Sequence, residues 1–443
     1  MKPFSNIHNF LFSLSGVLLL MYAMPATAAI KVVEYDLPNG LHVILHEDHS
    51  APLVAVSVMY HVGAKNEDPK QSGFTDFMEH ILSNGGDSHT GEYNEMVQAA
   101  GGQSGSNTTQ DRTVFYELLP SAQMGLGIWV ESRHMAYARM DKATVDEQRK
   151  IVKQEKYKYY SQPYALRYNI IYENAYTSSP YRWNTIAKDQ YADKATAEEL
   201  TAYYKEYYAP NNAVIVVAGD INEQYARDYI DRYFGDIPAT AKPVNHPADV
   251  EPVHTTEKRI AYYDNVQAPG VIIAYHIPAY GTPDYYGVQL LMRLLSAGNN
   301  SRFNKNITAA GKAQNVSAIA IGNEQPGLAI VLGIAAQGVK PDELEHNILS
   351  EIDKLNQVAE DEYQRIEDKA ESDYVLDNQK LQVLAQNLAS KYTYLHNTRL
   401  IDDEISNYRK VTRADLARIA AKYFTKQNRL VVYYLPKSMQ QKK

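Results

Sequence analysis

The chain has 443 residues, of which 45% are hydrophobic and 22% are charged, and its formal net charge at pH 7 is −8. This composition is ordinary for a globular protein that can bury more than one core. The chain has no cysteine, which excludes disulfides, thiol nucleophiles and thiolate metal ligands. The acidic balance argues against nucleic-acid binding, which needs clustered lysine and arginine to neutralise phosphates.

The first 28 residues have the pattern of a signal peptide. Lys2 precedes an apolar run from Leu11 to Met24, and the small residues of Pro25-Ala26-Thr27-Ala28 follow it. We expect cleavage after Ala28 and export to the periplasm or otherwise out of the cytoplasm, with no stable membrane span once the signal is removed. An uncleaved N-terminal anchor is the alternative, but the run is short for a membrane span.

The helical stretch Asp76-Phe77-Met78-Glu79-His80 carries the residues most typical of metal chemistry. Side chains three and four positions apart share one face of a helix, so Asp76, Glu79 and His80 are expected to point the same way. The inverted zinc-peptidase motif is His-x-x-Glu-His, in which two imidazoles bind zinc and the glutamate is the general base. Here an aspartate stands in the first imidazole position. The alternative is an ordinary exposed helix, where acidic residues near a histidine are common.

Two segments of the chain match at an offset of 216 residues (412 − 196), and each reads as an amphipathic helix followed by an apolar strand. Thr196, Leu200, Tyr207, Tyr208, Asn212, Val214 and Val216 fall on Thr412, Leu416, Tyr423, Phe424, Asn428, Leu430 and Val432. Further upstream, the strand-like run Val54 to Val62 lies near the same offset from Val271 to Ile277. The sequence therefore predicts an internal duplication.

Four prolines between residues 238 and 252 interrupt a stretch without apolar periodicity, which predicts a linker. We therefore expect an N-terminal domain at residues 29–237, a linker at 238–252 and a C-terminal domain at 253–443. Each half mixes strands with helices in an order that predicts an α+β fold, with helices packed on a largely antiparallel sheet. The polar stretch Lys340 to Leu395 predicts two or more helices.

Further segments lie around the helical motif: Gly63 to Glu67 before it, and then Gly101 to Thr109, Asp111 to Glu117 and Ile151 to Lys156 after it. With them the chain resembles the M16 family of insulinase and mitochondrial processing peptidase, and in particular its periplasmic bacterial members. The likeness covers nearly all of the mature chain. It implies two duplicated M16-type domains that fold over one another, usually with a second such pair in the same chain or in a partner.

The resemblance also implies a function and a site. Substrate peptides of the family lie as an added strand along a sheet edge beside the metal and are cleaved endoproteolytically. By position, His80 and Glu155 match zinc ligands, Asp76 takes the place of the first histidine ligand, and Glu79 matches the general base. One Zn²⁺ ion is the implied cofactor. A carboxylate binds zinc at about 2.0–2.2 Å, but aspartate reaches less far than histidine and makes the centre more neutral.

Two other positions differ from the family pattern. The family usually has an Asn-Ala pair where this chain has Gly105-Ser106, and we expect Gly105, Ser106 and Asn107 to contact substrate. Ser301-Arg302-Phe303 fits the pattern of the second half, whereas Thr308 and Gln314 stand where some members have an assisting arginine and tyrosine. Many bacterial members lack that pair and use a separate partner chain.

Two functions remain open. The first is an exported zinc metallopeptidase that hydrolyses peptide bonds with a metal-activated water at an atypical Asp-x-x-Glu-His site. The second is a catalytically inactive subunit that pairs with an active homologue and shapes its substrate chamber. In either case we expect a homodimer, or a heterodimer with a second M16-like protein.

Overall fold

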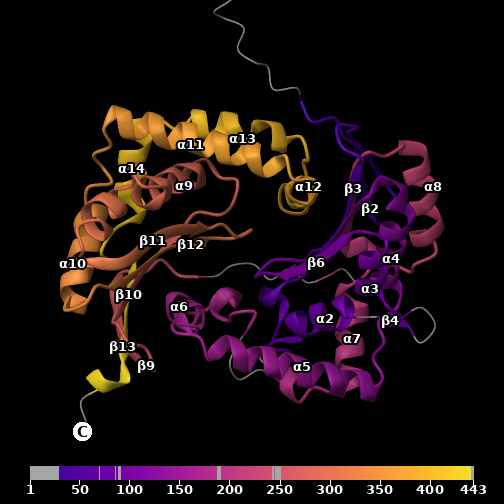
Figure 1. Ribbon diagram of the computed structural model, residues 1–443, viewed down its shortest axis with the longest axis horizontal. Helices are drawn as coiled ribbons and strands as arrows, with labels where there is room; N and C mark the ends of the chain where they lie inside the picture. Colours follow the sequence, from indigo (N-terminus) through magenta and orange to yellow (C-terminus); the bar gives the residue numbers. More distant parts are fainter. Residues whose placement is uncertain are drawn as a thin grey trace, which may run out of the picture. The chain divides into compact units, whose positions relative to one another are not determined.

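The computed structural model describes residues 29–440, apart from residues 69, 85, 88–90, 187–190, 242–243 and 245–250. The expected signal peptide and much of the expected linker therefore lie outside the described residues. The chain folds into two large mixed sheets, one of six strands and one of five, with helices packed on them (Figure 1). This confirms the predicted α+β class.

The N-terminal sheet has the strand order β1-β2-β8-β3-β7-β6, and only the β2–β8 pair in it is parallel. Its strands are β1 (Val33–Asp36), β2 (His42–Glu47), β3 (Leu53–Tyr60), β6 (Gln103–Thr108), β7 (Thr113–Pro120) and β8 (Ala213–Gly219). All seven residues of β8 are buried, as expected for an apolar strand inside a sheet that is covered on both faces. Strand β6 forms one edge of the sheet.

The C-terminal sheet has the order β11-β12-β10-β13-β9, and only β13 and β9 are parallel. Its strands are β9 (Lys258–Asp264), β10 (Gly270–Ile277), β11 (Ala313–Ile321), β12 (Gly327–Ala335) and β13 (Arg429–Pro436). This order repeats β6-β7-β3-β8-β2 of the first sheet strand for strand. The predicted duplication is therefore confirmed at the level of sheet topology.

The repeated segments also share their local hydrogen bonds. Thr196 and Thr412 form capping boxes at the starts of α7 (Ala197–Tyr207) and α14 (Arg413–Tyr423). After each helix an asparagine amide donates to the carbonyl of the helix's last residue, from Asn212 to Tyr207 at 2.8 Å and from Asn428 to Tyr423 at 2.7 Å. These caps and turns explain why both segments keep the same polar residues at the same spacing.

The remaining α-helices pack on the sheets or on one another. They are α2 (Phe74–Ser83), α3 (Tyr93–Ala99), α4 (Met124–Ala136), α5 (Lys142–Tyr160), α6 (Arg167–Ala175), α8 (Glu223–Phe234), α9 (Pro283–Ser296), α10 (Pro341–Ile352), α11 (Glu360–Asn378), α12 (Leu381–Leu395) and α13 (Leu400–Arg409). Helices α10, α11 and α12 occupy the polar stretch that was predicted to be helical.

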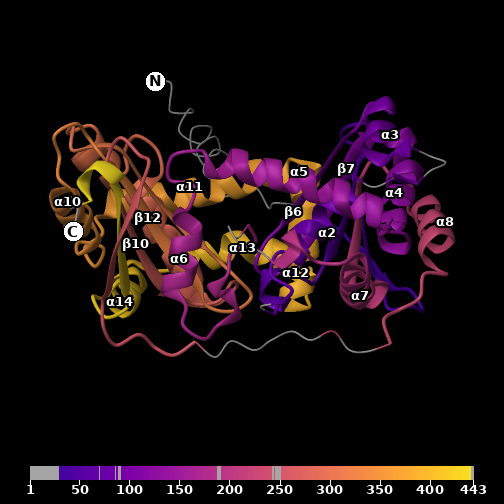
Figure 2. The ribbon, with the colours of Figure 1, turned by 90° about the horizontal axis from the view of Figure 1, so that it is seen from below.

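The two halves exchange one helix each (Figures 1 and 2). Helix α6 of the N-terminal half packs on β10 and β13, where Ile171 joins a buried cluster with Ile272 and Val432. Helix α12 of the C-terminal half packs on β3, β7 and β8, and its Thr393 hydroxyl donates to the sulfur of Met59. Each sheet is therefore covered on one face by a helix from the other half.

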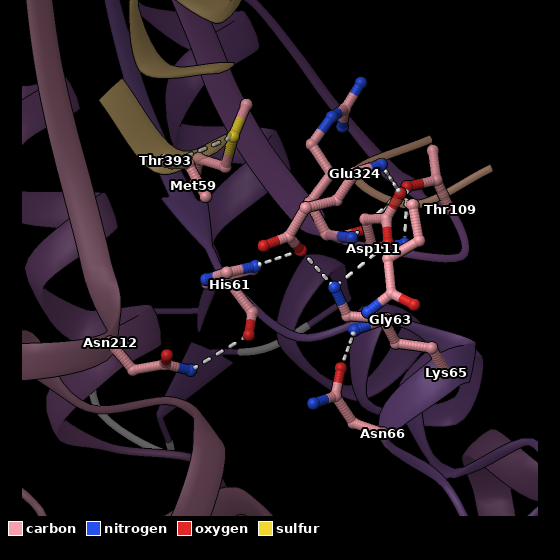
Figure 3. Close-up of polar contacts among 12 residues, drawn as sticks. Met59, His61, Gly63, Lys65, Asn66, Thr109, Asp111, Asn212, Glu324 and Thr393 are labelled. Carbon is pink, nitrogen blue, oxygen red and sulfur yellow. Dashed lines mark hydrogen bonds and ion pairs between the residues drawn. The ribbon is translucent and has the colours of Figure 1, made fainter. Parts of the chain in front are cut away.

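A polar group, which we call the inter-half cluster, also joins the halves; it consists of the buried Lys65 and Asp111 and the partly exposed His61 and Glu324 (Figure 3). Lys65 Nζ lies 3.0 Å from Asp111 Oδ1 and also pairs with the Glu324 carboxylate. His61 Nε2 lies 2.8 Å from Glu324 Oε2, and the Glu324 amide donates to Asp111 Oδ2 at 2.9 Å. Because Glu324 sits in the turn between β11 and β12, the cluster fixes the end of that hairpin to the N-terminal half.

Candidate metal centre

Helix α2, which carries the Asp-x-x-Glu-His motif, is fixed at its N-terminus by a buried carboxylate. Glu67 accepts hydrogen bonds from the backbone amides of Gly73 and Thr75, both at 2.8 Å. Burial raises the pKa of Glu67 to about 7, and the hydrogen bonds from Thr75 and Gly73 act against that rise. A carboxylate at this end of a helix also interacts favourably with the helix dipole. Glu67 therefore sets where the motif begins.

The motif lies where the buried face of α2 meets its exposed face. Phe77 and Met78 are buried in the core, and Asp76 is buried too, with an exposed fraction of 8%. Glu79 and His80 are partly exposed. The predicted helix is therefore present, but its first motif residue points much further into the protein than the other two.

Helix α5 brings Glu155 to His80. The Asp141 side chain caps this helix by accepting from the Thr144 amide, and α5 packs on α2. His80 Nε2 lies 3.6 Å from Glu155 Oε2. Two ligands of a tetrahedral zinc ion, each at about 2.0–2.1 Å from it, stand about 3.4 Å apart. The His80–Glu155 pair thus has the spacing of two ligands to one ion.

Asp76 does not complete a compact three-ligand group with this pair. Burial raises the pKa of Asp76 to about 7, the charge of His80 lowers it and the charge of Glu79 raises it. Within the described chain, two groups of three metal-capable side chains have ligand atoms that all lie within 4.8 Å of one another, and neither group contains Asp76, His80 or Glu155. The donor types fit zinc, and two of the three donors are correctly spaced. The side chain of Asp76 or of Glu155 would have to shift for all three to bind one ion.

The Glu79 carboxylate is held by the edge strand of the sheet. Ser106 Oγ on β6 donates to Glu79 Oε1 at 2.8 Å, and Ser83 Oγ at the end of α2 donates to Ser106 Oγ at 2.8 Å. Ser106 lies opposite Phe115, a core residue of β7, so its side chain points toward α2. Ser106, which was predicted to contact substrate, therefore orients the candidate base.

The two neighbours of Ser106 are placed differently. Gly105 lies against the ring of Tyr116, because a Cβ atom at position 105 would stand 2.6 Å from the Tyr116 hydroxyl oxygen. Asn107 is exposed on β6. The packing against Tyr116 gives Gly105 a structural role that does not depend on substrate, and a role for Gly105, Ser106 or Asn107 in substrate binding stays a prediction.

Two residues near the site were given no role from the sequence. One is Glu67, which could have been found as an acidic residue shortly before a predicted helix start. The other is Lys156, which is buried beside Glu155 and has its Nζ 3.4 Å from both oxygens of Asp193. A lysine rarely occupies a buried position without a partner, but the sequence alone does not show that this face of α5 is buried.

Family models match both parts of the chain. The model described as insulinase, peptidase family M16, matches residues 42–189, and the model described as the peptidase M16 inactive domain matches residues 194–369. The chain belongs to the M16 peptidase family. Its first matched segment includes the whole candidate metal centre. The expected family membership is therefore confirmed.

Named M16 proteins are similar to this chain over most of its length. The zinc protease PqqE of Helicobacter pylori is 22% identical over 438 residues, which are 96% of this chain and 98% of that protein. The crystal structure of a protease from Helicobacter pylori has a TM-score of 0.87 and 21% identity, and the match covers 92% of this chain and all of the other. The first half of the periplasmic protease PqqL from Escherichia coli has a TM-score of 0.72 and 17% identity, with 92% and 93% covered.

Proposed function

We propose that this M16 protein is an exported zinc peptidase that cleaves peptides or small proteins at an atypical Asp-x-x-Glu-His centre. The observation that carries the proposal is the 3.6 Å spacing of His80 Nε2 and Glu155 Oε2 from two different helices. The relative PqqE is named a zinc protease, which supports the choice of metal.

Each residue of the centre has a distinct task in this proposal. His80 and Glu155 would hold the ion, and Asp76 would complete the ligand set after its side chain turns toward them. A bound zinc ion lowers the pKa of its water to about 7. Glu79 would take the proton from the attacking water, and the Ser106 hydroxyl would keep its carboxylate in place.

Strand β6 offers a place for the substrate. Its only strand neighbour in the described sheet is β7, so its outer edge has backbone groups available for an added strand. An extended peptide that pairs with this edge would be bound through its main chain and largely independently of its sequence. Such a peptide would lie beside Ser106 and hence beside Glu79.

The first experiment measures zinc and cleavage together in purified mature protein. We expect one zinc ion per chain at saturation, and metal-dependent cleavage of an unstructured peptide. Glu79→Gln should keep the zinc and lose the cleavage, whereas His80→Ala should lose both. A chain that binds no zinc at saturation, or a Glu79→Gln variant that still cleaves, would overturn the proposal.

A second experiment tests the altered ligand directly. Asp76→His restores the family's ligand type, and it should increase zinc affinity and cleavage if the rest of the machinery is intact. Asp76→Asn is the matched control, because it keeps the size of the side chain and removes its charge. Equal zinc affinity in all three proteins would show that position 76 is not a ligand.

The position of Asp76 also favours a second candidate function, a non-catalytic subunit that pairs with an active M16 protein. Its carboxyl is buried and does not form a compact three-ligand group with His80 and Glu155. The match to the whole periplasmic protease PqqL from Escherichia coli covers only 48% of that protein. A chain of that length has room for two units of the size of this protein. This candidate predicts co-purification with a second M16 protein whose activity is unchanged by Glu79→Gln. A lone chain that digests peptides unaided would exclude it.

Export is part of the same proposal. A similar structure is that of a periplasmic protease, and no helix in the described ranges is both long and apolar enough to cross a membrane. N-terminal sequencing of the protein from cell fractions tests the expected cut after Ala28. A mature periplasmic form that begins at Ala29 would support the proposal, and an uncut cytoplasmic form would contradict it.

A further inference from the structure

A second group of metal-capable side chains is buried in the core of the N-terminal half. Glu117 comes from β7, and Glu131 and His134 come from α4, which packs on β7. Their ligand atoms all lie within 4.8 Å of one another, and their exposed fractions are 1%, 0% and 4%. None of these residues belongs to the candidate centre on α2 and α5.

Each of the three side chains has one polar atom that lacks a hydrogen-bond partner in the described part of the chain. These atoms are Glu117 Oε2, Glu131 Oε1 and His134 Nε2. The other ring nitrogen of the histidine, Nδ1, faces Glu131 Oε2 at 3.4 Å. A buried polar atom without a partner costs about 1–3 kcal/mol, and native proteins nearly always supply such atoms with a partner, a water or an ion.

The surroundings of the group are aromatic. The ring of Phe115 lies 5.1 Å from that of His134 between centroids, and the ring of Tyr93 lies 5.5 Å from it. The Tyr60 hydroxyl is fully buried and also lacks a hydrogen-bond partner within the described ranges. Burial raises the pKa of Tyr60 well above its usual value, and the nearby charges of Glu131 and Glu117 add to that rise. The three side chains thus face one another in a region closed to solvent.

Electrostatics favour a cation at this point. Burial raises the pKa of both glutamates well above the usual range and lowers the pKa of His134 to about 4. An isolated buried charge is very costly, so without a cation the carboxyls must keep protons. Two carboxylates and a neutral imidazole around a divalent cation form a neutral group instead, and each side chain has a ligand atom close to those of the other two.

We propose that Glu117, Glu131 and His134 bind one structural divalent cation with nitrogen and oxygen ligands, such as Zn²⁺ or Mn²⁺. One histidine and two carboxylates are a donor set that suits both ions. The Tyr60 hydroxyl, which is buried without a partner in the described ranges and is affected by the charges of both glutamates, is a candidate for a further ligand or for a hydrogen bond to one. The ion would link α4 to β7, the strand of the N-terminal sheet on which this helix packs.

The other group of three, Glu251, His254 and His276, does not support the same inference. Both oxygens of the Glu251 carboxylate accept hydrogen bonds from the backbone amides of residues 177–179, at 2.8–3.0 Å. His276 Nε2 donates to the Ala175 carbonyl at 2.8 Å. The protein itself therefore occupies these ligand atoms.

The test uses the double variant His80→Ala/Glu155→Ala, which removes the candidate centre on α2 and α5. Protein from cells grown with added zinc or manganese is dialysed against EDTA while folded, and its metal is counted by mass spectrometry. We expect one ion per chain to remain, because the buried group is closed to the chelator. Unfolding and refolding in EDTA should remove that ion and lower the thermal midpoint.

Two further measurements locate the ion. Adding Glu117→Gln/Glu131→Gln to that background keeps the side-chain size and removes both charges, and the retained ion should then be lost. Adding Glu251→Gln is the matched control and should leave the ion in place. If the glutamine variant does not fold, anomalous diffraction from the His80→Ala/Glu155→Ala protein decides the question, with a peak expected between Glu117, Glu131 and His134. A folded metal-free protein, or a peak elsewhere, would overturn the proposal and leave a protonated carboxyl pair.

Discussion

Lys65 Nζ lies 3.0 Å from Asp111 Oδ1, and the exposed fractions of the two side chains are 1% and 4%. The lysine also pairs with Glu324 of the other half, so one buried cation serves carboxylates from both halves. Buried ion pairs add little stability compared with a well-packed apolar core, but removing one partner is costly because the remaining charge is left without compensation. Lys65 is therefore the member whose loss matters most.

We predict that Lys65→Met destabilises the protein by about 3–5 kcal/mol, because it leaves the buried Asp111 carboxylate, and the partly exposed one of Glu324, without their shared cation. Urea unfolding followed by circular dichroism measures this change. Lys142→Met is the control, since its ion pair with Asp146 is on the surface and the lysine side chain is 87% exposed. The control should change stability by less than about 1 kcal/mol. Equal effects in both variants would mean that the inter-half cluster does not stabilise the fold.

The free energy of unfolding should fall at acid pH as the Glu324 carboxylate becomes protonated. Burial raises the pKa of this carboxyl, but His61 and Lys65 outweigh it and lower the pKa from 4.5 to about 2. A lowered pKa contributes stability that is present above pH 4.5 and is lost as the pH falls from 4.5 toward 2. The groups that face Glu324 are His61 and Lys65, and Lys65 also faces Asp111.

The measurement for Glu324 is the free energy of unfolding as a function of pH. Glu324→Gln should be less stable than the wild type at neutral pH, and its stability should depend less steeply on pH between 4.5 and 2. Parallel pH profiles of the two proteins would show that Glu324 does not titrate with folding.

Ser106→Ala should slow peptide cleavage if the proposed function is right. The variant removes the 2.8 Å hydrogen bond to the Glu79 carboxylate. A hydrogen bond to a charged group is worth about 1.5–3 kcal/mol, so kcat/KM should fall about 10- to 100-fold. Ser104→Ala is the matched control on the same strand, because Ser104 Oγ donates to Asn94 Oδ1 instead. A loss of similar size in both variants would point to damage to β6 and not to the base.

The helix exchange predicts that the halves do not fold separately. Cut at the expected linker, residues 29–237 lack α12, which covers one face of their sheet and buries Leu384 and Leu388. Each buried leucine contributes about 1.5–3 kcal/mol, which is a large part of a typical total stability of about 5–15 kcal/mol. The fragment made alone should be insoluble or unfolded, and co-expression with residues 253–443 should give a soluble complex. A fragment that unfolds cooperatively on its own would contradict this.

Much of the fold could be predicted from the sequence because the duplicated segments repeat their capping residues. Thr196 and Thr412 begin equivalent helices, and Asn212 and Asn428 close equivalent turns. The exchange of α6 and α12 could not be predicted in this way. An amphipathic pattern shows that a helix has an apolar face, but it does not show which sheet that face covers.

The candidate site was also predictable in part, because local sequence spacing determines which side chains share a helix. Helical spacing correctly placed Asp76, Glu79 and His80 on one helix, and the family likeness pointed to Glu155. Spacing does not show how deeply each side chain is buried, so the burial of Asp76 and the lack of a compact group with His80 and Glu155 required the structure. The hydrogen bond from Ser106 to Glu79 could not be predicted from the sequence either, since it depends on how β6 aligns with β7.

The close packing of Gly105 on Tyr116 limits how the family's substrate-binding asparagine could be regained. A Cβ atom at position 105 would stand 2.7 Å from Cζ of the tyrosine ring as well as 2.6 Å from its hydroxyl oxygen. Gly105→Asn on its own would therefore meet an occupied volume. A larger side chain at position 105 therefore requires the Tyr116 ring to move aside or to be replaced.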